Sequence, residues 1–506
     1  MKKSISLVLT VLITMMLISG CTSNTETGNV PESPAKTNLV VMSAAKAINY
    51  DPTVGAQTDT IALHSIFDSL VKFDDNADII PYLAESWELD SSGLIYSFKL
   101  RKDVKFHDGT ALTADDVVYT LDTMKANPVY AMMAGWIKSW NKVDDYTITI
   151  ERPNGLTNTM NYLAGQVMII PKGAHSKDPA GFAMNPVGSG AYKFVSIEPD
   201  GSTKLESNEA YFLGVPEMKT ITIKAPLDPS AAILSLQTGE IDILTTVNGT
   251  QLEQIKNDSK ITTIAFNGWS QNGLYLMGER LNNDPNLRQA IVYGVNRQNL
   301  IDLAAFGLGT LSQDLFAKRV MGEFEGAAPV PGYNLDMAKE FVAKANDVVT
   351  PLVLSITPDQ AIMAQSIQSD LAALGLEVQI EQLEMNAFYE KLMNKETEMG
   401  IMMLGTFQMT VDSFMFYYAS YSPFIGNAIN QTPEYDALVG QIMMTADGTE
   451  LRKLCIQALE HVTGMNIQVP LFDTTMMLAQ NKTIENISPQ SAGTYVFYLG
   501  DIKAAK

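Results

Sequence analysis

The stretch from Tyr96 to Asp122, YSFKLRKDVKFHDGTALTADDVVYTLD, carries more information about the fold than any other part of this chain. At its start the residues alternate in character. Tyr96, Phe98 and Leu100 are apolar, and the residues between them are polar. Because successive side chains of a strand point to opposite faces, this period of two predicts a strand with one buried face.

The second half of this stretch predicts a turn and a helix. Val104 and Phe106 indicate a second short strand, which the turn dipeptide Asp108–Gly109 ends. Thr113 is typical of a helix N-cap, and Asp116 follows in the first turn. An acidic side chain is favourable there because the exposed backbone N–H groups make that end of a helix positive.

Further along the chain, strands alternate with helices. The segment 39–42 is expected to be a buried strand, and strands at 352–355 and 376–380 enclose a predicted helix. Such a strand–helix–strand unit requires parallel pairing with a right-handed crossover. An apolar strand is expected at 400–404. The loop 405–413 would then leave the carboxyl end of a central strand, where open α/β sheets bind ligands.

The N-terminus has the features of a targeting segment. Two lysines precede an apolar run at 5–18, which is too short to span a bilayer comfortably. The run ends in LISGC at 17–21, which resembles a bacterial lipobox, so we expect cleavage before Cys21 and acylation of that residue. An ordinary secretory signal with an incidental cysteine is the alternative. Residues 22–38 lack aromatic side chains and are predicted to form a flexible tether.

Composition narrows the class of protein. The formal net charge is -21 over 506 residues, which disfavours nucleic acid and anionic lipid surfaces as partners because both bind basic patches. The only other cysteine, Cys455, lies in an apolar helical pattern and is predicted to be a buried thiol. If Cys21 carries lipid, no intramolecular disulfide can form. The core must then hold the fold, and the chain is long enough for two or three domains.

Other motifs lie before and after this first stretch. They are the run DDNADIIPYLAESWELDSSGLIYSFKLR at 74–101, the glycine-rich VGSGAYKF at 187–194, LESNEAYFLGVPEMKTITIK at 205–224, GEID at 239–242 and PNLRQAIVYGV at 285–295. Together with the HDGT turn and the capped helix, they resemble the peptide/nickel family (family 5) of extracytoplasmic solute-binding proteins, which deliver ligands to ABC importers. The resemblance extends from about Leu39 to Val469.

The resemblance implies an α/β architecture, the type II periplasmic-binding-protein fold, with two lobes, an inserted subdomain and a hinge. In this interpretation residues 1–20 are a lipoprotein signal peptide and 21–38 the tether. Lobe I comprises residues 39–72, 187–277 and 480–506, the inserted subdomain comprises 73–186, and lobe II comprises 278–479. Bound ligand would favour the closed state of the cleft between the lobes.

The sequence contains no recognisable catalytic or metal-binding motif. No two of the four histidines have the spacing of metal ligands, and the sequence contains neither HExxH nor a GxSxG elbow. Carboxylates are plentiful, but a sequence cannot pair two of them across a cleft, as a glycosidase requires. We therefore expect no enzymatic activity, no cofactor and no metal site.

A two-lobed receptor needs aromatic faces and a few fixed polar groups in its cleft. Two candidates follow the first strand, two lie where lobe I passes to lobe II, four lie in the loop after the 400–404 strand and the helix that follows it, and one lies in the subdomain. In chain order they are Asn49, Tyr50, Trp136, Trp269, Gln271, Phe407, Thr410, Asp412 and Tyr417.

Four of these candidates have a plainer interpretation. Asn49 and Tyr50 precede Asp51–Pro52 and are equally consistent with turn chemistry. Trp136 is as consistent with core packing as with ligand contact. Tyr417 and its neighbouring tyrosines are also consistent with the packing of a helix after the loop.

The loop bears on the choice of ligand. Phe407 falls where the family often has tryptophan, and Asp412–Ser413 aligns with the family's Asp-Pro step. The peptide receptors carry an aspartate a few residues earlier that pairs with the ligand's α-amino group, and this chain has Gln408, Met409 and Thr410 there. The loss removes a charge-assisted hydrogen bond worth roughly 1.5–3 kcal/mol, unless Asp412 substitutes. Nickel receptors also lack that aspartate.

The resemblance thus predicts a monomeric binding protein outside the cytoplasm, held to the membrane by lipid at Cys21. It would capture a small peptide or related solute and deliver it to an ABC permease. A nickel or metal-chelate receptor of the same family is the first alternative. A secreted hydrolase and a sensing receptor without transport are alternatives from other classes.

Overall fold

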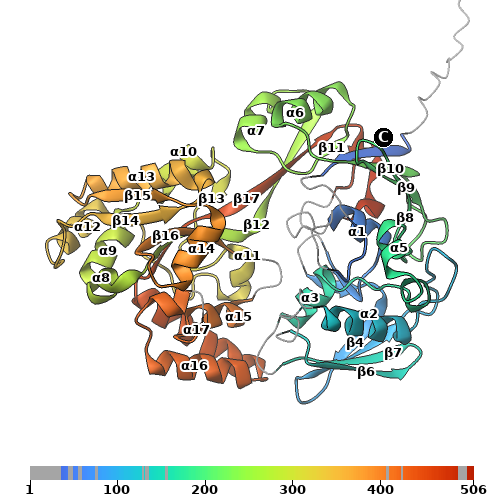
Figure 1. Cartoon of the computed structure of the whole chain (residues 1–506), viewed down its shortest axis with the longest axis horizontal. Helices are drawn as coiled ribbons and strands as arrows, with labels where there is room; N and C mark the ends of the chain where they lie inside the picture. The colour runs from blue at the N-terminus through green and yellow to red at the C-terminus, as the bar shows by residue number, and fades with distance from the viewer. Residues whose placement is uncertain are drawn as a thin grey trace, which may run out of the picture. The chain divides into compact units, whose positions relative to one another are not determined.

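The computed structural model describes residues 36–43, 49–54, 60–74, 78–127, 130, 136–153, 158–405, 410–422, 425–487 and 498–505. From Thr37 onward the chain forms one compact unit (Figure 1). Cys21 and the predicted signal peptide lie outside the described residues, and so does Phe407.

One sheet of eleven strands dominates the described part of the chain. Its hydrogen-bonded order is β15-β14-β16-β12-β17-β11-β1-β10-β9-β8, and β13 pairs with β17 beside this path. The strands are β1 (Asn38–Met42), β8 (Tyr192–Ile197), β9 (Thr203–Ser207), β10 (Thr220–Lys224), β11 (Ile243–Leu244), β12 (Ile261–Leu276), β13 (Gly309–Thr310), β14 (Leu352–Ile356), β15 (Val378–Gln382), β16 (Met399–Leu404) and β17 (Gln468–Asn481).

Two long strands connect the halves of this sheet. β12 and β17 pair antiparallel over most of their length and lie side by side in Figure 1. On one side of them, β1 is parallel to β10 and β11. On the other side, β14 is parallel to β15 and β16, which confirms the parallel pairing predicted around 352–380.

A separate four-stranded antiparallel sheet contains the stretch that opened the sequence analysis. Its order is β4-β5-β7-β6, formed by β4 (Ala84–Leu89), β5 (Ile95–Leu100), β7 (Thr147–Glu151) and β6 (Ser139–Asp144). Tyr96, Phe98 and Leu100 of β5 are buried and the residues between them are more exposed, as their alternation predicts. β2 (Val71–Phe73) and β3 (Ile79–Pro81) form a hairpin, and β18 (Ile484–Glu485) pairs with β19 (Lys503–Ala504).

The predicted second strand around Val104 and Phe106 is wrong in its extent. Only an isolated bridge between Lys105 and Ala111 forms there. The backbone N–H of Phe106 donates to the carbonyl of Thr110 (2.9 Å), so the chain reverses around Gly109 (φ 86°) before a ladder can extend. The side chains of Val104 and Phe106 are nevertheless buried.

The helices lie between these strands. They are α1 (Thr60–Ile66), α2 (Ala114–Ala126), α3 (Thr159–Gly165), α4 (Lys172–His175), α5 (Pro179–Met184), α6 (Pro229–Thr238), α7 (Gly249–Ile255), α8 (Gly278–Asn283), α9 (Pro285–Gly294), α10 (Arg297–Ala304), α11 (Lys318–Met321), α12 (Leu335–Val342), α13 (Ala361–Ala372), α14 (Met385–Met393), α15 (Val411–Met415), α16 (Pro433–Met444) and α17 (Gly448–Gly464).

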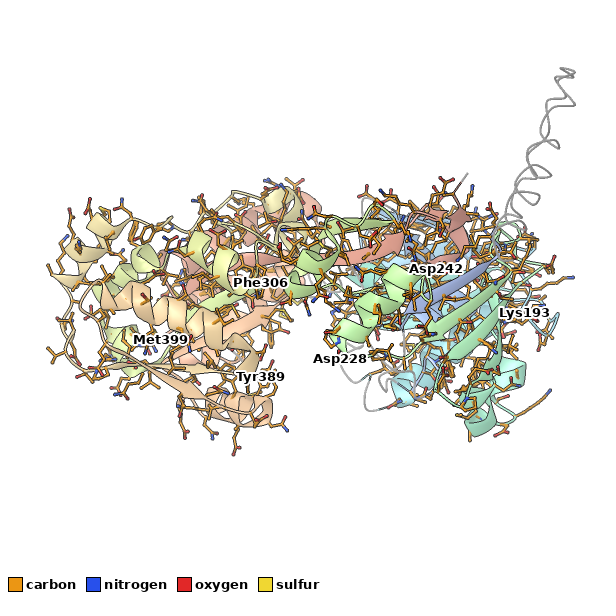
Figure 2. The ribbon with its side chains drawn as sticks, turned by 90° about the horizontal axis from the view of Figure 1, so that it is seen from above. Lys193, Asp228, Asp242, Phe306, Tyr389 and Met399 are labelled. Carbon is orange, nitrogen blue, oxygen red and sulfur yellow. The ribbon has the colours of Figure 1, made fainter. Side chains whose placement is uncertain are left out.

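Capping residues define several helix ends, and Thr113 does so where the sequence predicts it. Thr113 is the N-cap of α2, and the carboxylate of Asp116 accepts from its backbone N–H at 2.9 Å. Asp228, labelled at the start of α6 in Figure 2, accepts from the backbone of the first turn, and Gly239 ends that helix at φ 77°. Asp242, also labelled there, precedes β11, and its side chain accepts from the N–H of Val40 in β1 (2.9 Å).

The apolar core contains the thiol predicted to be buried. Cys455, on α17, is fully buried, and burial raises the pKa of the thiol. Cys455 belongs to one large apolar cluster, which also includes residues of α9, α13 and the adjoining strands. A second cluster lies around β1, α1 and β10. In the described ranges, no helix is both long enough and apolar enough to cross a membrane.

Candidate ligand-binding site

The strand β12 is irregular at the point where the sequence analysis placed Trp269 and Gln271. Asn267 pairs with Thr475 and Gln271 with Asp473, so the three residues 268–270 stand opposite Thr474 alone. Bulges of this kind re-aim side chains and recur beside functional sites. The hydroxyl of Thr474 donates to the carbonyl of Ser270 (2.8 Å), which holds the bulge to β17.

Trp269 lies in this bulge and is 8% exposed. Its ring centroid is 6.4 Å from that of Phe73, at the end of β2, and the guanidinium carbon of Arg319, on α11, lies 5.5 Å from it. The indole Nε1 is buried and has no hydrogen-bond partner among the described residues. An unsatisfied buried donor costs about 1–3 kcal/mol, and buried tryptophans usually find an acceptor.

The end of β16 reaches the same bulge. The hydroxyl of Ser270 donates to the carbonyl of Gly405 at 2.8 Å. Gly405 has φ 123°, and a Cβ there would lie 2.0 Å from the carbonyl oxygen of Trp269. The loop predicted to contact ligand therefore begins against the bulge, although residues 406–409, including Phe407, lie outside the described residues.

Gln271 belongs to a satisfied buried network. It is 2% exposed, and its Nε2 donates to the carboxylate of Asp473 (2.9 Å) and to the carbonyl of Asp314 (3.1 Å). Its Oε1 accepts from Gln468 at 3.3 Å. The second oxygen of Asp473 accepts from the backbone N–H of Lys318 (2.8 Å). Gln271 thus braces β12 against β17 and α11, and its predicted ligand contact stays a prediction.

The two candidates after β1 have local partners. The side-chain oxygen of Asn49 accepts from the N–H of Asp51 (3.1 Å), which is turn chemistry. Tyr50 is 1% exposed, its ring lies 5.0 Å from that of Phe194, and its hydroxyl is hydrogen-bonded to Thr203. Core packing is therefore the simpler interpretation of Tyr50, and neither residue is brought together with Trp269 by a described contact.

Trp136 and Tyr417 also pack against neighbouring rings. The Trp136 ring centroid is 4.7 Å from that of Tyr162, and its carbonyl accepts from Thr159 (2.6 Å). The Tyr417 ring is 5.5 Å from that of Phe414, and burial raises the pKa of the Tyr417 phenol. Both remain half-buried, so a ligand contact stays a prediction for each.

The remaining loop candidates lie at the start of α15. Thr410 is the N-cap, and its backbone N–H donates to the hydroxyl of Ser413 (3.0 Å). Asp412 lies in the first turn and is buried. The structure therefore gives Thr410 a capping role and leaves the predicted ligand contacts of Thr410 and Asp412 as predictions.

Sequence reasoning missed Phe73 and Arg319. Phe73 belongs to a three-residue strand, and Arg319 to a four-residue helix, so neither lies in a periodic pattern long enough to reveal its neighbours. Their contacts with Trp269 join positions about 200 and 50 residues away in sequence, which local patterns do not report.

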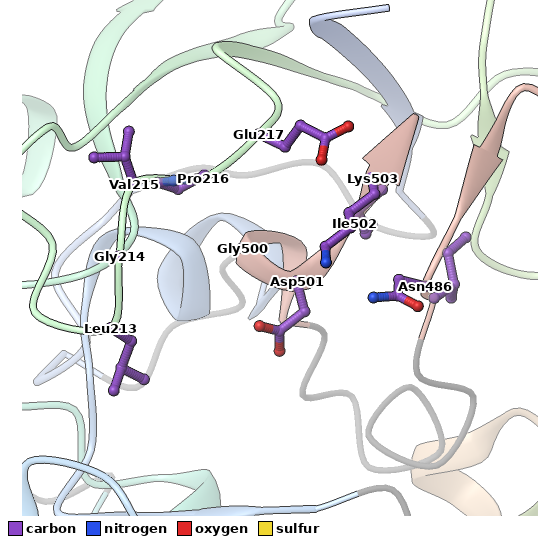
Figure 3. Close-up of a pocket in the computed structure, with 11 residues that line it drawn as sticks. Leu213, Gly214, Val215, Pro216, Glu217, Asn486, Gly500, Asp501, Ile502 and Lys503 are labelled. Carbon is purple, nitrogen blue, oxygen red and sulfur yellow. The ribbon is translucent and has the colours of Figure 1, made fainter. Parts of the chain in front are cut away.

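The structure also contains a cavity of about 560 Å³ away from these residues (Figure 3). It lies between the loop 213–217 and the C-terminal segments 486–487 and 500–503, and none of the predicted ligand-binding residues lines it. Nowhere in the described ranges do three or more His, Cys, Asp or Glu side chains gather as metal ligands.

Comparison with known proteins identifies the family. The family model of the bacterial extracellular solute-binding proteins, family 5 (Middle), matches residues 78–427. The chain belongs to this family. As a family 5 member it is a solute-binding protein and not an enzyme, so the alternative of a secreted hydrolase is set aside.

Three relatives of the family 5 chain are binding proteins by name. Heme-binding protein A of Haemophilus influenzae is 24% identical, over 98% of this chain and 98% of its own length. The dipeptide-binding protein of Escherichia coli is 26% identical, over 73% and 76%. The nickel-binding periplasmic protein of Escherichia coli is 23% identical, over 86% and 89%.

Solved structures establish the fold of the family 5 chain. The ABC transporter substrate-binding protein CtaP of Listeria monocytogenes superposes with a TM-score of 0.81 at 20% identity, over 93% of this chain and 100% of that one. The oligopeptide-binding protein AppA of Bacillus subtilis, in complex with a nonapeptide, gives 0.71 at 22% identity, over 94% and 100%. The chain therefore has the predicted type II periplasmic-binding-protein fold.

Proposed function

We propose that this family 5 protein captures a small peptide or a related solute in a cleft between two lobes and delivers it to an ABC permease. The proposal adds a lipid anchor at Cys21, which keeps a monomer at the outer face of the membrane. Family membership, with the family model matching residues 78–427, is the observation that carries it.

The architecture around β12 and β17 supports this mechanism. These two strands are the paired connection between the parallel strands on either side of the sheet. The predicted lobe boundaries place lobe I on the β1 side and lobe II on the β14 side, with the bulge at 268–270 in the connection. Two rigid bodies joined by a few strands close around ligand by hinge motion, and ligand stabilises the closed state.

Two solute classes compete. The dipeptide-binding relative favours a peptide, but the residues at 408–410 lack the carboxylate with which peptide receptors pair the α-amino group. The nickel-binding relative favours a metal chelate, which is the alternative. Heme-binding protein A, which matches nearly the whole chain, makes hemin a third probe.

Thermal shift against a fixed panel distinguishes these ligands. The chain from Thr37 onward, which forms one compact unit, is heated with Ala-Phe dipeptide, with nickel–histidine or with hemin. A solute at about 100 times its Kd adds about 2.7 kcal/mol to the free energy of unfolding and raises the Tm by several degrees. A shift with dipeptide alone supports peptide capture, and a shift with nickel–histidine alone supports the alternative. No shift with any solute contradicts the proposal.

The anchor and the hinge have separate tests. Labelled fatty acid is expected to be incorporated into the full-length protein. Cys21→Ala is expected to abolish this incorporation and to give a soluble protein.

Small-angle scattering is expected to show a monomer whose radius of gyration decreases when a panel solute binds. An unchanged radius with bound solute would argue against closure of two lobes.

A further inference from the structure

A close approach outside β12 and β17 joins the predicted inserted subdomain to the predicted lobe II. Gly93 lies in the turn between β4 and β5, and Ala446 lies in the loop between α16 and α17. A Cβ built on Gly93 would be 3.3 Å from the carbonyl oxygen of Ala446 and 3.6 Å from its methyl carbon. Both the four-stranded sheet and α16 are found at the lower edge of Figure 1.

Hydrogen bonds hold the turn 90–94 in one shape. The backbone N–H of Gly93 donates to the carbonyl of Asp90 (3.0 Å), and the side chain of Asp90 accepts from the N–H of Leu94 (3.1 Å). The Nε of Arg152, which is buried, donates to the carbonyl of Gly93 (2.7 Å). Gly93 has φ 70°, which glycine adopts without strain. The tip of this turn is therefore rigid where it meets the loop.

The loop 445–447 is fixed by the two helices that it connects. The N–H of Thr445 donates to the carbonyl of Ile442 (3.3 Å) at the end of α16. Asp447 is the N-cap of α17 and accepts from the N–H of Glu450 (2.8 Å). A contact between two segments that are already ordered loses little conformational entropy when it forms.

The composition of the two segments favours contact between them. Small uncharged residues form both tips, although the net charge of the chain is -21: Ser92, Gly93, Thr445 and Ala446. Exposed apolar side chains flank both tips: Leu89 (43% exposed), Ile95 (37%), Met443 (36%) and Met444 (69%). Contact between the tips avoids repulsion of like charges and removes apolar surface from water, and both effects stabilise it.

We propose that the turn 90–94 and the loop 445–447 form a latch, which joins the two sides of the cleft at a second place when solute is bound. The inference rests on the proposed function, in which two lobes close around a solute. β12 and β17 join the lobes permanently, whereas the latch is a surface contact that opens. A contact made only in the closed state stabilises that state, so the latch slows release of the solute without touching it.

A disulfide across the latch tests the contact directly. The built Cβ of Gly93 lies 3.6 Å from the Cβ of Ala446, within the range of about 3.5–4.5 Å that disulfides require. Gly93→Cys with Ala446→Cys is made in the chain from Thr37 onward, where Cys455 is the only other cysteine and is buried. Under mild oxidation this pair should cross-link about tenfold faster than the control pair.

The control pair is Gly93→Cys with Gly440→Cys. Gly440 lies on α16, six residues before the loop position, and a Cβ there meets nothing within 4 Å. Both pairs share the cysteine at the turn, so the comparison isolates the geometry of the loop. The control pair also reports any direct effect of an added solute on thiol oxidation.

Bound solute should favour the closed latch. Ala-Phe dipeptide, nickel–histidine and hemin are added in turn. The compound that binds should speed cross-linking of the latch pair about threefold relative to the control pair, because it populates the closed state. Once formed, the disulfide should slow release of that compound about tenfold, and reduction should restore the original rate.

Ala446→Trp tests the latch without a cross-link. The bulky side chain at the tip of the loop prevents the close approach to Gly93, so release of the bound compound should become about threefold faster. The substitution lies outside the apolar core, and circular dichroism checks that the variant is folded.

The results distinguish the latch from the proposed function. Cross-linking of the latch pair no faster than the control pair would overturn the latch. A panel compound that binds but changes neither the rate of cross-linking nor, in the cross-linked protein, the rate of release would also overturn the latch and leave the proposed function standing. Rapid cross-linking of the latch pair in a protein that binds no panel compound would support the contact and contradict the proposed function alone.

Discussion

At the scale of single residues, burial determines which carboxylates respond to pH. Asp68 is completely buried, and its carboxylate accepts from the hydroxyls of Ser189 (2.8 Å) and Tyr211 (3.3 Å). Burial raises its pKa to about 6, although these hydrogen bonds oppose the shift. The folded state therefore binds this proton more tightly than the unfolded chain does.

Asp68→Asn is expected to change how stability depends on pH. Because the folded pKa lies above the unfolded one, the stabilisation from this group is complete below the unfolded pKa and is lost as pH rises through about 6. When the pH is lowered from 7.5 to 4.5, the free energy of unfolding of the wild type should rise by about 2 kcal/mol relative to that of Asp68→Asn. Urea unfolding of both proteins at the two pH values measures this, and a constant difference would contradict the prediction.

Position 405 has a backbone conformation and surroundings that only glycine fits. Its φ of 123° is a region that L side chains rarely adopt, and a Cβ would lie 2.0 Å from a backbone oxygen. Gly405→Ala should lower the free energy of unfolding by about 1–3 kcal/mol. As a control, Gly440→Ala in α16, where a Cβ meets nothing within 4 Å, should raise it by about 0.5–1 kcal/mol. Chemical denaturation compares the two, and equal effects would argue against the close approach at Gly405.

At the scale of an element, α2 shows how a short motif positions a helix in the tertiary structure. Asp116, which the sequence places in the first turn, accepts from the N–H of Thr113 and also from the N–H of Lys172 (3.0 Å). The second contact ties the start of α2 to α4, more than fifty residues away. Asp116 thus caps α2 and also makes a tertiary contact with the start of α4.

Asp116→Ala should therefore cost more than the loss of a surface cap. Two backbone N–H groups lose their acceptor, so the free energy of unfolding should fall by about 1–3 kcal/mol. Asp115→Ala is the matched control: its exposed side chain pairs with Lys142, and its loss should cost at most about 1 kcal/mol. Thermal unfolding of the two variants tests this. A larger loss of stability in Asp115→Ala than in Asp116→Ala would contradict the role given to Asp116.

At the scale of the whole molecule, the chain from Thr37 onward contains a single cysteine, so the core holds the fold without a disulfide. Cys455 is fully buried on α17, within the largest apolar cluster. Its reactivity therefore reports on opening of that core.

The reaction of Cys455 with a thiol reagent should therefore require global unfolding. In native buffer, Ellman's reagent should react with Cys455 far more slowly than with a free thiol, and in denaturant one thiol per chain should react at once. The midpoint measured by thiol reactivity should coincide with that measured by circular dichroism. Rapid reaction in native buffer would indicate that the region around α17 opens independently of the rest.

Some features of this protein follow from local sequence. The alternation at Tyr96, Phe98 and Leu100, the cap at Thr113 and the turn at Gly109 depend on neighbours within a few residues, and the structure reproduces them. The parallel pairing of β14 and β15 also follows, because a helix between two strands allows little else. Ordered motifs were sufficient to indicate the family, which the comparison confirms.

Other features arise only in the folded chain. The sequence identified Trp269 as a candidate, but its contacts with Phe73 and Arg319 come from segments far apart, and the bulge at 268–270 depends on how β12 meets β17. Likewise, the sequence did not reveal that the buried side chains of Tyr50 and Gln271 are hydrogen-bonded to Thr203 and Asp473. Local patterns report which residues are apolar or polar, whereas long-range packing decides which buried polar groups find a hydrogen-bond partner.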